Sequence, residues 1–318
     1  MLGNIEMIVI GFILLTVGAK FLVKSSSNIA KKYHIPEMLV GLTIVAIGTS
    51  MPEIIITITS ATKGHADLII GNAIGSNLCN LLLILGLGCL IYPIKTDKEV
   101  RKIHFPVSII SAIILLILAN IDNSISRIEG FFLLGIFFTY FAYPIYKETE
   151  NIVETNRAKN KMSKEEKKIN IFLSIIGIVL GIALLKFGGD FVVDNAVDIA
   201  HKFNLSERII GLTIISVGTA LPELIITIFA AKNKSMDMAV GNLVGSNVLN
   251  LLLIIGLGSL VTPLAFTTDF NVNLLLFVLA STIVWILACC NKDKKLTRLN
   301  GIMMIIAFFL YIMKLFII

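Results

Sequence analysis

Two glutamates are the residues best suited to chemistry in this sequence, because they are acidic side chains in the middle of long apolar runs. Glu53 follows Pro52 in the motif GTSMPE, and Glu223 follows Pro222 in GTALPE. A charged side chain at the centre of a bilayer is costly and is usually there for function. No other acidic residue lies as deep within an apolar run, so we expect these two to form the functional site.

The proline before each glutamate predicts a break in a membrane-spanning helix. Proline has no N–H for the carbonyl four residues earlier, and its ring clashes with that carbonyl. The carbonyls of Gly48 and Gly218 therefore lose their helical partners. Free carbonyls at this depth are tolerated only where they line a cavity or meet a ligand. The break thus sets backbone oxygens beside a carboxylate, a combination suited to a hard cation.

A polar stripe follows each broken segment. Its residues recur every four positions and therefore share one helical face. Hydrogen bonding between helices is the alternative reading of such a stripe, but a buried glutamate precedes it both times, which favours an oxygen-lined ion site. The stripe consists of Asn72, Ser76, Asn80, Asn242, Ser246 and Asn250.

Calcium suits this set of oxygens, because it takes about six to eight oxygen ligands in flexible geometry. The two glutamates and the amide oxygens of Asn80 and Asn250 supply part of that number. Freed carbonyls near Thr49 and Thr219 supply the rest. Two carboxylates also neutralise one divalent ion, which removes much of the penalty of burying charge. Magnesium, which demands tighter octahedral geometry, stays open as an alternative.

The composition requires a membrane protein. Of 318 residues, 56% are hydrophobic and 15% are charged, and the mean hydropathy is +0.91. A soluble domain carries about a quarter of its residues as charged side chains, so a water-soluble enzyme is excluded. The net charge of +6 resides in loops between apolar runs and does not indicate nucleic-acid binding. The four cysteines have neither disulfide-framework nor zinc-ligand spacing.

Ten apolar runs, five on each side of a hydrophilic stretch, predict an all-α polytopic protein with ten transmembrane helices. We expect a first transmembrane repeat at residues 1–146, a charged cytoplasmic linker at 147–169 and a second repeat at 170–318. The apolar runs are 3–24, 37–62, 67–92, 103–121, 127–146, 170–193, 207–231, 236–262, 272–290 and 297–317.

The two halves are copies of each other. A shift of 170 positions lays residues 11–88 on 181–258 without a gap, and roughly half of the positions are identical. An ungapped match of this length indicates duplication. Each copy has five spans, an odd number, so the second copy enters the membrane from the opposite side.

The basic residues predict the orientation of this inverted pair. The loops after spans one, three, five, seven and nine contain twenty Lys and Arg residues, and the alternate loops contain four. Cytoplasmic loops carry the excess of basic residues. We therefore expect the odd-numbered loops in the cytoplasm and both termini outside the cell.

At these motifs the sequence resembles the calcium/cation antiporter superfamily, and most closely the prokaryotic sodium/calcium exchangers. GTSMPE and GNAIGSN lie within residues 37–88, and GTALPE and GNLVGSN lie within 207–258. The resemblance implies an antiporter of the cell membrane that exchanges one calcium ion for several sodium ions by alternating access. It also implies that the first and sixth spans slide across the remaining bundle.

The resemblance further implies that Ca²⁺ and Na⁺ are transported ions, with no cofactor, no nucleic acid and no obligatory protein partner beside the lipid bilayer. Backbone carbonyls near Ala46 and Ser216 are additional candidate ligands. The ligand side chains that it implies are Glu53, Glu223, Thr49, Ser50, Thr219, Ser76, Asn80 and Ser246.

Two positions depart from the archaeal exchangers that the sequence resembles. Asn250 stands where they have an acidic residue, and Ala220 stands where they have a serine after the threonine. Both changes bear on the monovalent ions, so Ca²⁺/H⁺ exchange and K⁺-dependent exchange stay open beside Ca²⁺/Na⁺ exchange.

Two other classes fit less well. A channel also lines its pore with oxygens, but inverted repeats with interrupted helices are typical of transporters. An intramembrane enzyme that uses a metal needs ligand spacing that the four histidines, all in or near loops, do not have.

Overall fold

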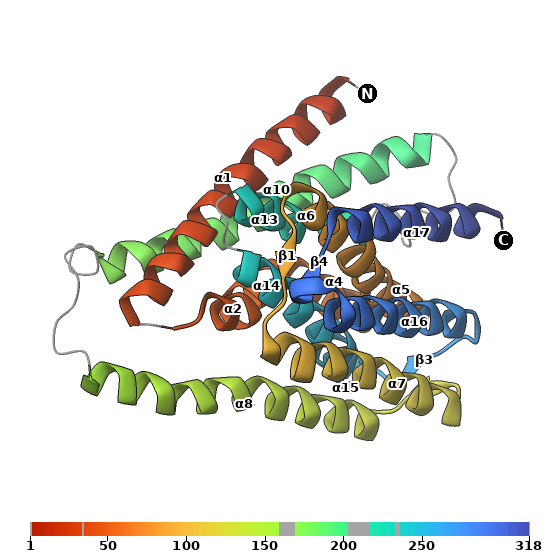
Figure 1. Cartoon of the computed structure of the whole chain (residues 1–318). Coiled ribbons are helices and arrows are strands. Elements are labelled where there is room, and N and C mark those ends of the chain that lie inside the picture. Colours follow the sequence, from red (N-terminus) through yellow and green to blue (C-terminus); the bar gives the residue numbers. More distant parts are fainter. Residues whose placement is uncertain (1, 34, 159–168, 203–215, 233–235, 318) are drawn as a thin grey trace.

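The computed structural model describes residues 2–33, 35–158, 169–202, 216–232 and 236–317, and nearly all of these residues are helical (Figure 1). Among them, eight helices are long and apolar enough to cross a membrane. A ninth span is broken into Glu37–Thr49 and Met51–Thr62, bent by 44°. The predicted run 207–231 begins outside the described residues. Its described part is also broken, into the helices Ser216–Thr219 and Leu221–Lys232. The described residues thus contain eight or nine spans, in agreement with the all-α bundle of ten membrane helices expected from the sequence.

In the first repeat, the spans are built from α-helices with short π-helical insertions. A π-helix bonds each N–H to the carbonyl five residues earlier and usually occurs as a single-turn bulge. The elements are α1 (Leu2–Tyr33), α2 (Glu37–Val40), η1 (Gly41–Val45), α3 (Ala46–Thr49), α4 (Met51–Thr62), α5 (Ala66–Leu78), η2 (Cys79–Ile84), α6 (Leu85–Ile91), β1 (Ile94–Lys95), η3 (Val100–His104), α7 (Phe105–Ile121), β2 (Ser124–Ile125) and α8 (Arg127–Ala158).

In its described residues, the second repeat has counterparts of most of these elements close to the shift of 170. Helix α13 begins and ends at the positions of α4 shifted by 170, and η5 follows α14 as η2 follows α5. The elements are α10 (Ile171–Lys202), α12 (Ser216–Thr219), α13 (Leu221–Lys232), α14 (Met236–Leu249), η5 (Asn250–Ile254), α15 (Ile255–Val261), β3 (Leu264–Ala265), α16 (Asp269–Cys290), η6 (Lys292–Lys294), β4 (Lys295–Leu296) and α17 (Arg298–Ile317).

Helix α8 extends into the segment that we expected to be a linker. The fifth apolar run ends at 146, but the helix continues to Ala158. The sequence of this extension, KETENIVETNRA, contains several good helix formers. Adding residues to an existing helix avoids the cost of nucleation, so the polar segment prolongs α8. The rest of the predicted linker, 159–168, lies outside the described residues.

Helices α1 and α10 form a tightly packed antiparallel pair at one side of the bundle (Figure 1). Glycines bring the two backbones together. A Cβ at Gly18 would lie 2.9 Å from the carbonyl oxygen of Gly181, and one at Gly11 would lie 2.8 Å from that of Gly188. The pair has its own apolar cluster, which includes Leu15, Leu22 and Leu185 together with a few residues of the adjoining helices.

A larger apolar cluster unites the other spans of both repeats. It includes residues of α5 to α8 and their counterparts α14 to α17, so the two copies share one core. The long helices at its centre are the most buried, since 78% of an 18-residue apolar stretch within each of the spans Ala66–Ile91 and Met236–Val261 is inside the protein. In Figure 1, α8 lies along the opposite side of the molecule from α1.

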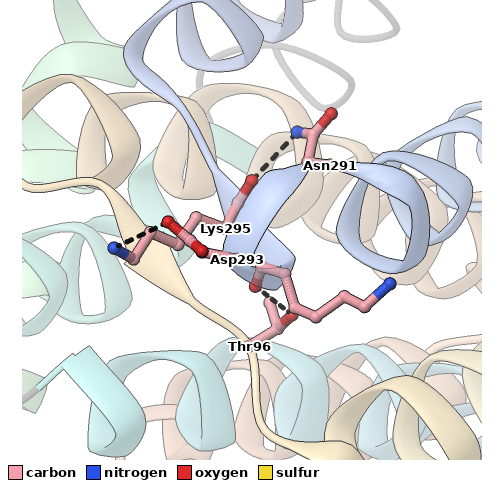
Figure 2. Close-up of polar contacts among 5 residues, drawn as sticks. Thr96, Asn291, Asp293 and Lys295 are labelled. Atoms are coloured by element: carbon pink, nitrogen blue, oxygen red, sulfur yellow. Dashed lines mark hydrogen bonds and ion pairs between the residues drawn. The ribbon is translucent and has the colours of Figure 1, made fainter.

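Two short antiparallel ladders tie the copies together. In the first, β1 pairs with β4, and in the second, β2 pairs with β3. Figure 2 shows polar contacts that support the first ladder: the Thr96 hydroxyl donates to the carbonyl of Lys294 at 2.9 Å, and the Asn291 side-chain amide donates to the carbonyl of Lys295 at 2.9 Å. Since β1 and β3 are equivalent positions in the two repeats, the ladders are counterparts of each other.

The closest backbone approach described here provides a test of this packing. A Cβ at Gly41 would lie 2.1 Å from the carbonyl oxygen of Met238. We expect Gly41→Ala to destabilise the protein by about 2 kcal/mol or more, because overpacking against backbone forces the helices apart. Thermal melting of the detergent-solubilised protein measures the loss. Gly135→Ala is the control, since that site on α8 has nothing within 4 Å, and an equal loss in both variants would contradict the prediction.

Candidate ion-binding site

The two glutamates occupy equivalent, fully enclosed places. Glu53 lies in the first turn of α4 and Glu223 in the first turn of α13, and each is only 1% exposed. An acidic residue is favoured at this position, because the N-terminus of a helix carries partial positive charge. The two carboxylates lie close enough for their charges to interact. The structure therefore brings together the side chains that the sequence singled out, one from each repeat.

The expected helix break lies directly before each glutamate. In the first repeat, α3 ends at Thr49 and Ser50 leaves the helical conformation, with φ −84° and ψ 10°. In the second, α12 ends at Thr219 and α13 begins at Leu221. Proline stands at the start of the new helix in both copies, where its missing N–H costs nothing. Because of the break, each glutamate lies in the first turn of a helix that begins inside the membrane bundle.

The carbonyls that we expected as ligands lie at this break and interact with the threonines. The Thr49 hydroxyl is 3.2 Å from the carbonyl oxygen of Ala46, which also accepts the N–H of Ser50 at 3.0 Å. In the second copy, the Thr219 hydroxyl is 3.3 Å from the carbonyl oxygen of Ser216. Both carbonyl oxygens therefore lie beside the threonine hydroxyl at the helix break of their own repeat.

Threonine and asparagine side chains cross from one repeat to the other. Thr49 donates to the side-chain oxygen of Asn242 at 3.1 Å, and Thr219 donates to that of Asn72 at 3.2 Å. Ser76 lies 3.3 Å from the Thr219 hydroxyl. The same threonine hydroxyls also lie beside the carboxylates of the other repeat. Thr219 interacts with Glu53, and Thr49 interacts with Glu223. These contacts fix each broken helix against the partner repeat's polar stripe.

The two carboxylates have different neighbours. The Glu223 carboxylate accepts from Ser50 at 3.4 Å and from Ser246 at 3.3 Å, and these two serines are 3.2 Å apart. The counterpart of Ser50 is Ala220, which has no hydroxyl to offer to Glu53. The site is therefore asymmetric, although the backbone around it is duplicated.

Four oxygen atoms at the site have no hydrogen-bond partner among the described residues. Two belong to the glutamates, as the Oε2 atoms of Glu53 and Glu223. The others are the Oδ1 atoms of Asn80 and Asn250, on η2 and η5. These segments pack against the glutamate-bearing helix of the other repeat, η2 against α13 and η5 against α4. Buried acceptors without partners are costly, so these oxygens are suited to accept a cation as a ligand.

The chemistry of these groups fits a hard cation. The set consists of two carboxylates with neutral amide, hydroxyl and carbonyl oxygens, and no cluster of three or more His, Cys, Asp or Glu side chains occurs in the described parts of the chain. Nitrogen and sulfur ligands, which transition metals favour, are thus missing from the set. Carboxylate and carbonyl oxygens suit calcium, magnesium or an alkali cation.

In both copies the stripe runs from an α-helix into a π-helical turn. Ser76 and Asn72 contact each other on α5 as four-residue spacing predicts, at 3.4 Å. Asn80 lies in π-helix η2, where hydrogen bonds join residues five positions apart instead of four. Asn250 occupies the equivalent place in η5. Insertions of this kind frequently occur at functional sites.

Four further buried polar residues were not among the expected ligands. Thr57 and Thr227 follow the glutamates by four residues, and their hydroxyls have no partner within the described chain. Asn77 and Asn247 lie beside the stripe, between its serines and its last asparagines. The four residues form two pairs that are equivalent at the shift of 170. This identity between the copies was the signal in the sequence that could have found them.

Comparison with known proteins gives a consistent result. The family model described as "Sodium/calcium exchanger protein" matches residues 4–146 and 173–317. The inner membrane protein YrbG of Escherichia coli is 30% identical over 90% of this chain and 90% of its own. The putative antiporter CaxA of Alkalimonas amylolytica is 33% identical over 96% of both chains. The sodium/calcium exchanger MaX1 of Methanosarcina acetivorans is 29% identical over 88% of this chain and 91% of its own.

A solved structure has the same fold over its full length. The sodium-calcium exchanger NCX_Mj, soaked with 2.5 mM Na⁺ and 0.1 mM Ca²⁺, superimposes with a TM-score of 0.81 at 28% identity. The match covers 97% of this chain and 97% of that one. The broken helices and buried glutamates described above therefore belong to a fold known in an ion exchanger.

The geometry predicts a divalent-cation site that depends on both glutamates. We expect Ca²⁺ to raise the melting temperature of the purified protein, because a ligand at 100 times its Kd stabilises the folded state by about 2.7 kcal/mol. Glu53→Gln and Glu223→Gln should each abolish this rise. Asp67→Asn, at an exposed carboxylate in the first turn of α5, is the control. A full Ca²⁺-dependent rise in both glutamine variants would refute the site.

Proposed function

The chain belongs to the sodium/calcium exchanger family, and from that premise we propose that it exchanges Ca²⁺ for Na⁺ across the cell membrane by alternating access. The family consists of cation/Ca²⁺ antiporters, and the relatives are transporters rather than enzymes. The proposal adds the counter-ion, the mechanism and the residues that bind the ions.

The pair of glutamates enclosed between the repeats is the observation that carries the proposal. Glu53 and Glu223 bring two negative charges into a place with 1% exposure, and each carboxylate keeps one oxygen without a partner. One Ca²⁺ balances both charges, and sodium ions can balance them in its place. The ligand set that we propose is Glu53, Glu223, Thr49, Ser50, Thr219, Ser76, Ser246, Asn80 and Asn250, with the carbonyls of Ala46 and Ser216.

Charge compensation also supports obligatory exchange. An uncompensated carboxylate pair in a low-dielectric site is unfavourable by several kcal/mol per ion. The site can therefore change its exposure from one side to the other only while cations occupy it. Ca²⁺ leaves on one side, Na⁺ takes its place, and the return step carries Na⁺ in the opposite direction. Such a cycle couples the two fluxes without any covalent chemistry.

The packing of α1 and α10 supports the moving part of the mechanism. These two helices are joined to each other by close glycine contacts and have an apolar cluster separate from the main core. A pair that is internally tight and separately packed can shift as one body against the remaining spans. The main core, which both repeats share, then serves as the fixed frame around the ions.

The direct test is calcium flux in proteoliposomes. We expect Na⁺-loaded vesicles to accumulate ⁴⁵Ca²⁺ when diluted into Na⁺-free buffer, because outward Na⁺ movement drives the exchange. Glu53→Gln and Glu223→Gln should lower the initial rate by at least about 100-fold, since removing one charge of a buried ionic set costs about 3–5 kcal/mol. Asp67→Asn should transport at the wild-type rate.

Separate gradients identify the counter-ion. If an imposed pH gradient drives uptake without Na⁺, the protein is a Ca²⁺/H⁺ exchanger, because protons neutralise the same carboxylates. If uptake requires K⁺ together with Na⁺, the exchange is K⁺-dependent. Either result would overturn Na⁺ as the sole counter-ion and leave the glutamate site in place.

The proposed orientation has both termini outside, with the basic loops in the cytoplasm. We expect alkaline phosphatase fused to the C-terminus to be active and the same enzyme fused after Ala158 to be inactive, because phosphatase matures only outside the cytoplasm. Fluorescent protein fusions at the same two points should give the opposite pattern. Active phosphatase at the point after Ala158 would reverse the orientation.

A further inference from the structure

A chain of side-chain amides links the two repeats beside the glutamates. The Asn77 side-chain nitrogen donates to the backbone carbonyl of Asn247 at 3.0 Å. The Asn250 side-chain nitrogen donates to the side-chain oxygen of Asn77, also at 3.0 Å. Asn77 is 0% exposed and Asn250 is 1% exposed. The chain ends at the Asn250 oxygen, which has no partner among the described residues.

The order of donors and acceptors in this chain follows from its first member. A backbone carbonyl can only accept a hydrogen bond, so the Asn77 group that faces Asn247 must be its NH₂. The other end of the Asn77 amide is then an oxygen, which can only accept. Asn250 must therefore present its own NH₂ to Asn77, and its oxygen is turned the other way. The carbonyl of Asn247 thus sets the orientation of two amides in succession.

We propose that Asn77 is a positioning residue for the ion site, which holds the Asn250 amide so that its oxygen is presented to the cation. This inference rests on the proposed function, in which Asn250 is a ligand. A cation is repelled by an NH₂ group and bound by a carbonyl oxygen. A free asparagine can rotate its amide by half a turn, whereas Asn250 in contact with Asn77 is held in the cation-binding orientation.

The location of Asn250 makes this orientation important. Asn250 begins η5, which packs against α4, the helix that carries Glu53. Asn77 itself lies on α5 and reaches across the interface between the repeats. Unlike a carboxylate, which offers an oxygen in either orientation, a neutral amide has one oxygen. An asparagine ligand therefore needs a second residue to orient it.

A double-mutant cycle on calcium binding tests the proposal. The variants are Asn77→Leu, Asn250→Ala and the combination of both, and the readout is the Ca²⁺ concentration that gives half of the maximal rise in melting temperature. We expect Asn77→Leu to weaken Ca²⁺ binding about tenfold, the size of one lost hydrogen bond to a ligand. In the Asn250→Ala background, the same change should weaken binding less than about twofold, because the amide that it orients is gone.

Additive losses in the cycle would overturn the proposal, since a residue that supports only the packing weakens binding whatever stands at position 250. Wild-type affinity in Asn77→Leu would overturn it as well. If Asn77→Leu does not fold, as judged by melting without Ca²⁺, Asn77→Ala carries the same cycle with less steric change.

An Asn250→Asp background provides a second, independent readout. A carboxylate there presents an oxygen in any orientation, so Asn77→Leu should have little effect on Ca²⁺ affinity in it. A tenfold loss in that background would contradict the orienting role. The cycle uses Ca²⁺ alone as its probe and so does not depend on the counter-ion. Absence of Na⁺-driven flux would defeat the proposed function, while the cycle would still decide the role of Asn77.

Discussion

The structure depends on one electrostatic constraint: two carboxylates must share a dehydrated space in the middle of a membrane bundle. Taking a charge out of water is costly even after the surroundings relax, and Glu53 and Glu223 are both almost fully enclosed. Their position at helix starts lowers that cost, and the surrounding hydroxyls lower it further. Some oxygens still have no hydrogen-bond partner in the described part of the chain, so part of the free-energy cost of burial remains. A bound cation lowers that remaining cost, and this favours cation binding. The helix breaks, the crossing side chains and the shared core all serve to hold this arrangement.

Duplication supplied most of the site residues in two copies, and the differences between the copies at the site are confined to neutral groups. The glutamates and the threonines before them are the same in both halves, whereas Ser50 faces Ala220 across the pseudo-symmetry. The amide chain from Asn247 through Asn77 to Asn250 also runs in one direction, since the Asn247 side-chain oxygen has no partner among the described residues. Neutral substitutions change the geometry offered to each ion without altering the total charge that must be balanced.

The sequence predicted the parts of this structure that follow from local chemistry. Burial of Glu53 and Glu223, the breaks at their prolines and the ten spans could be derived from apolar runs and backbone hydrogen bonding. The part played by Asn77 could not, because it depends on a contact with a residue 173 positions away. The π-helical turns at Asn80 and Asn250 depend on tertiary packing rather than on residue type. Two-residue strands such as β1 are too short to show any alternating pattern.

The two ladders bear on how the duplicated protein arose. Strand β1 of the first copy pairs with β4 of the second, and β2 of the first pairs with β3 of the second, so each copy contributes one strand to each ladder. Reciprocal exchange between equivalent surfaces is the signature of an isologous dimer interface. An ancestor of half this length, inserted in both directions in the same bilayer, would make these contacts as a homodimer. Fusion of two such genes would fix the two orientations in a single polypeptide and allow each half to diverge.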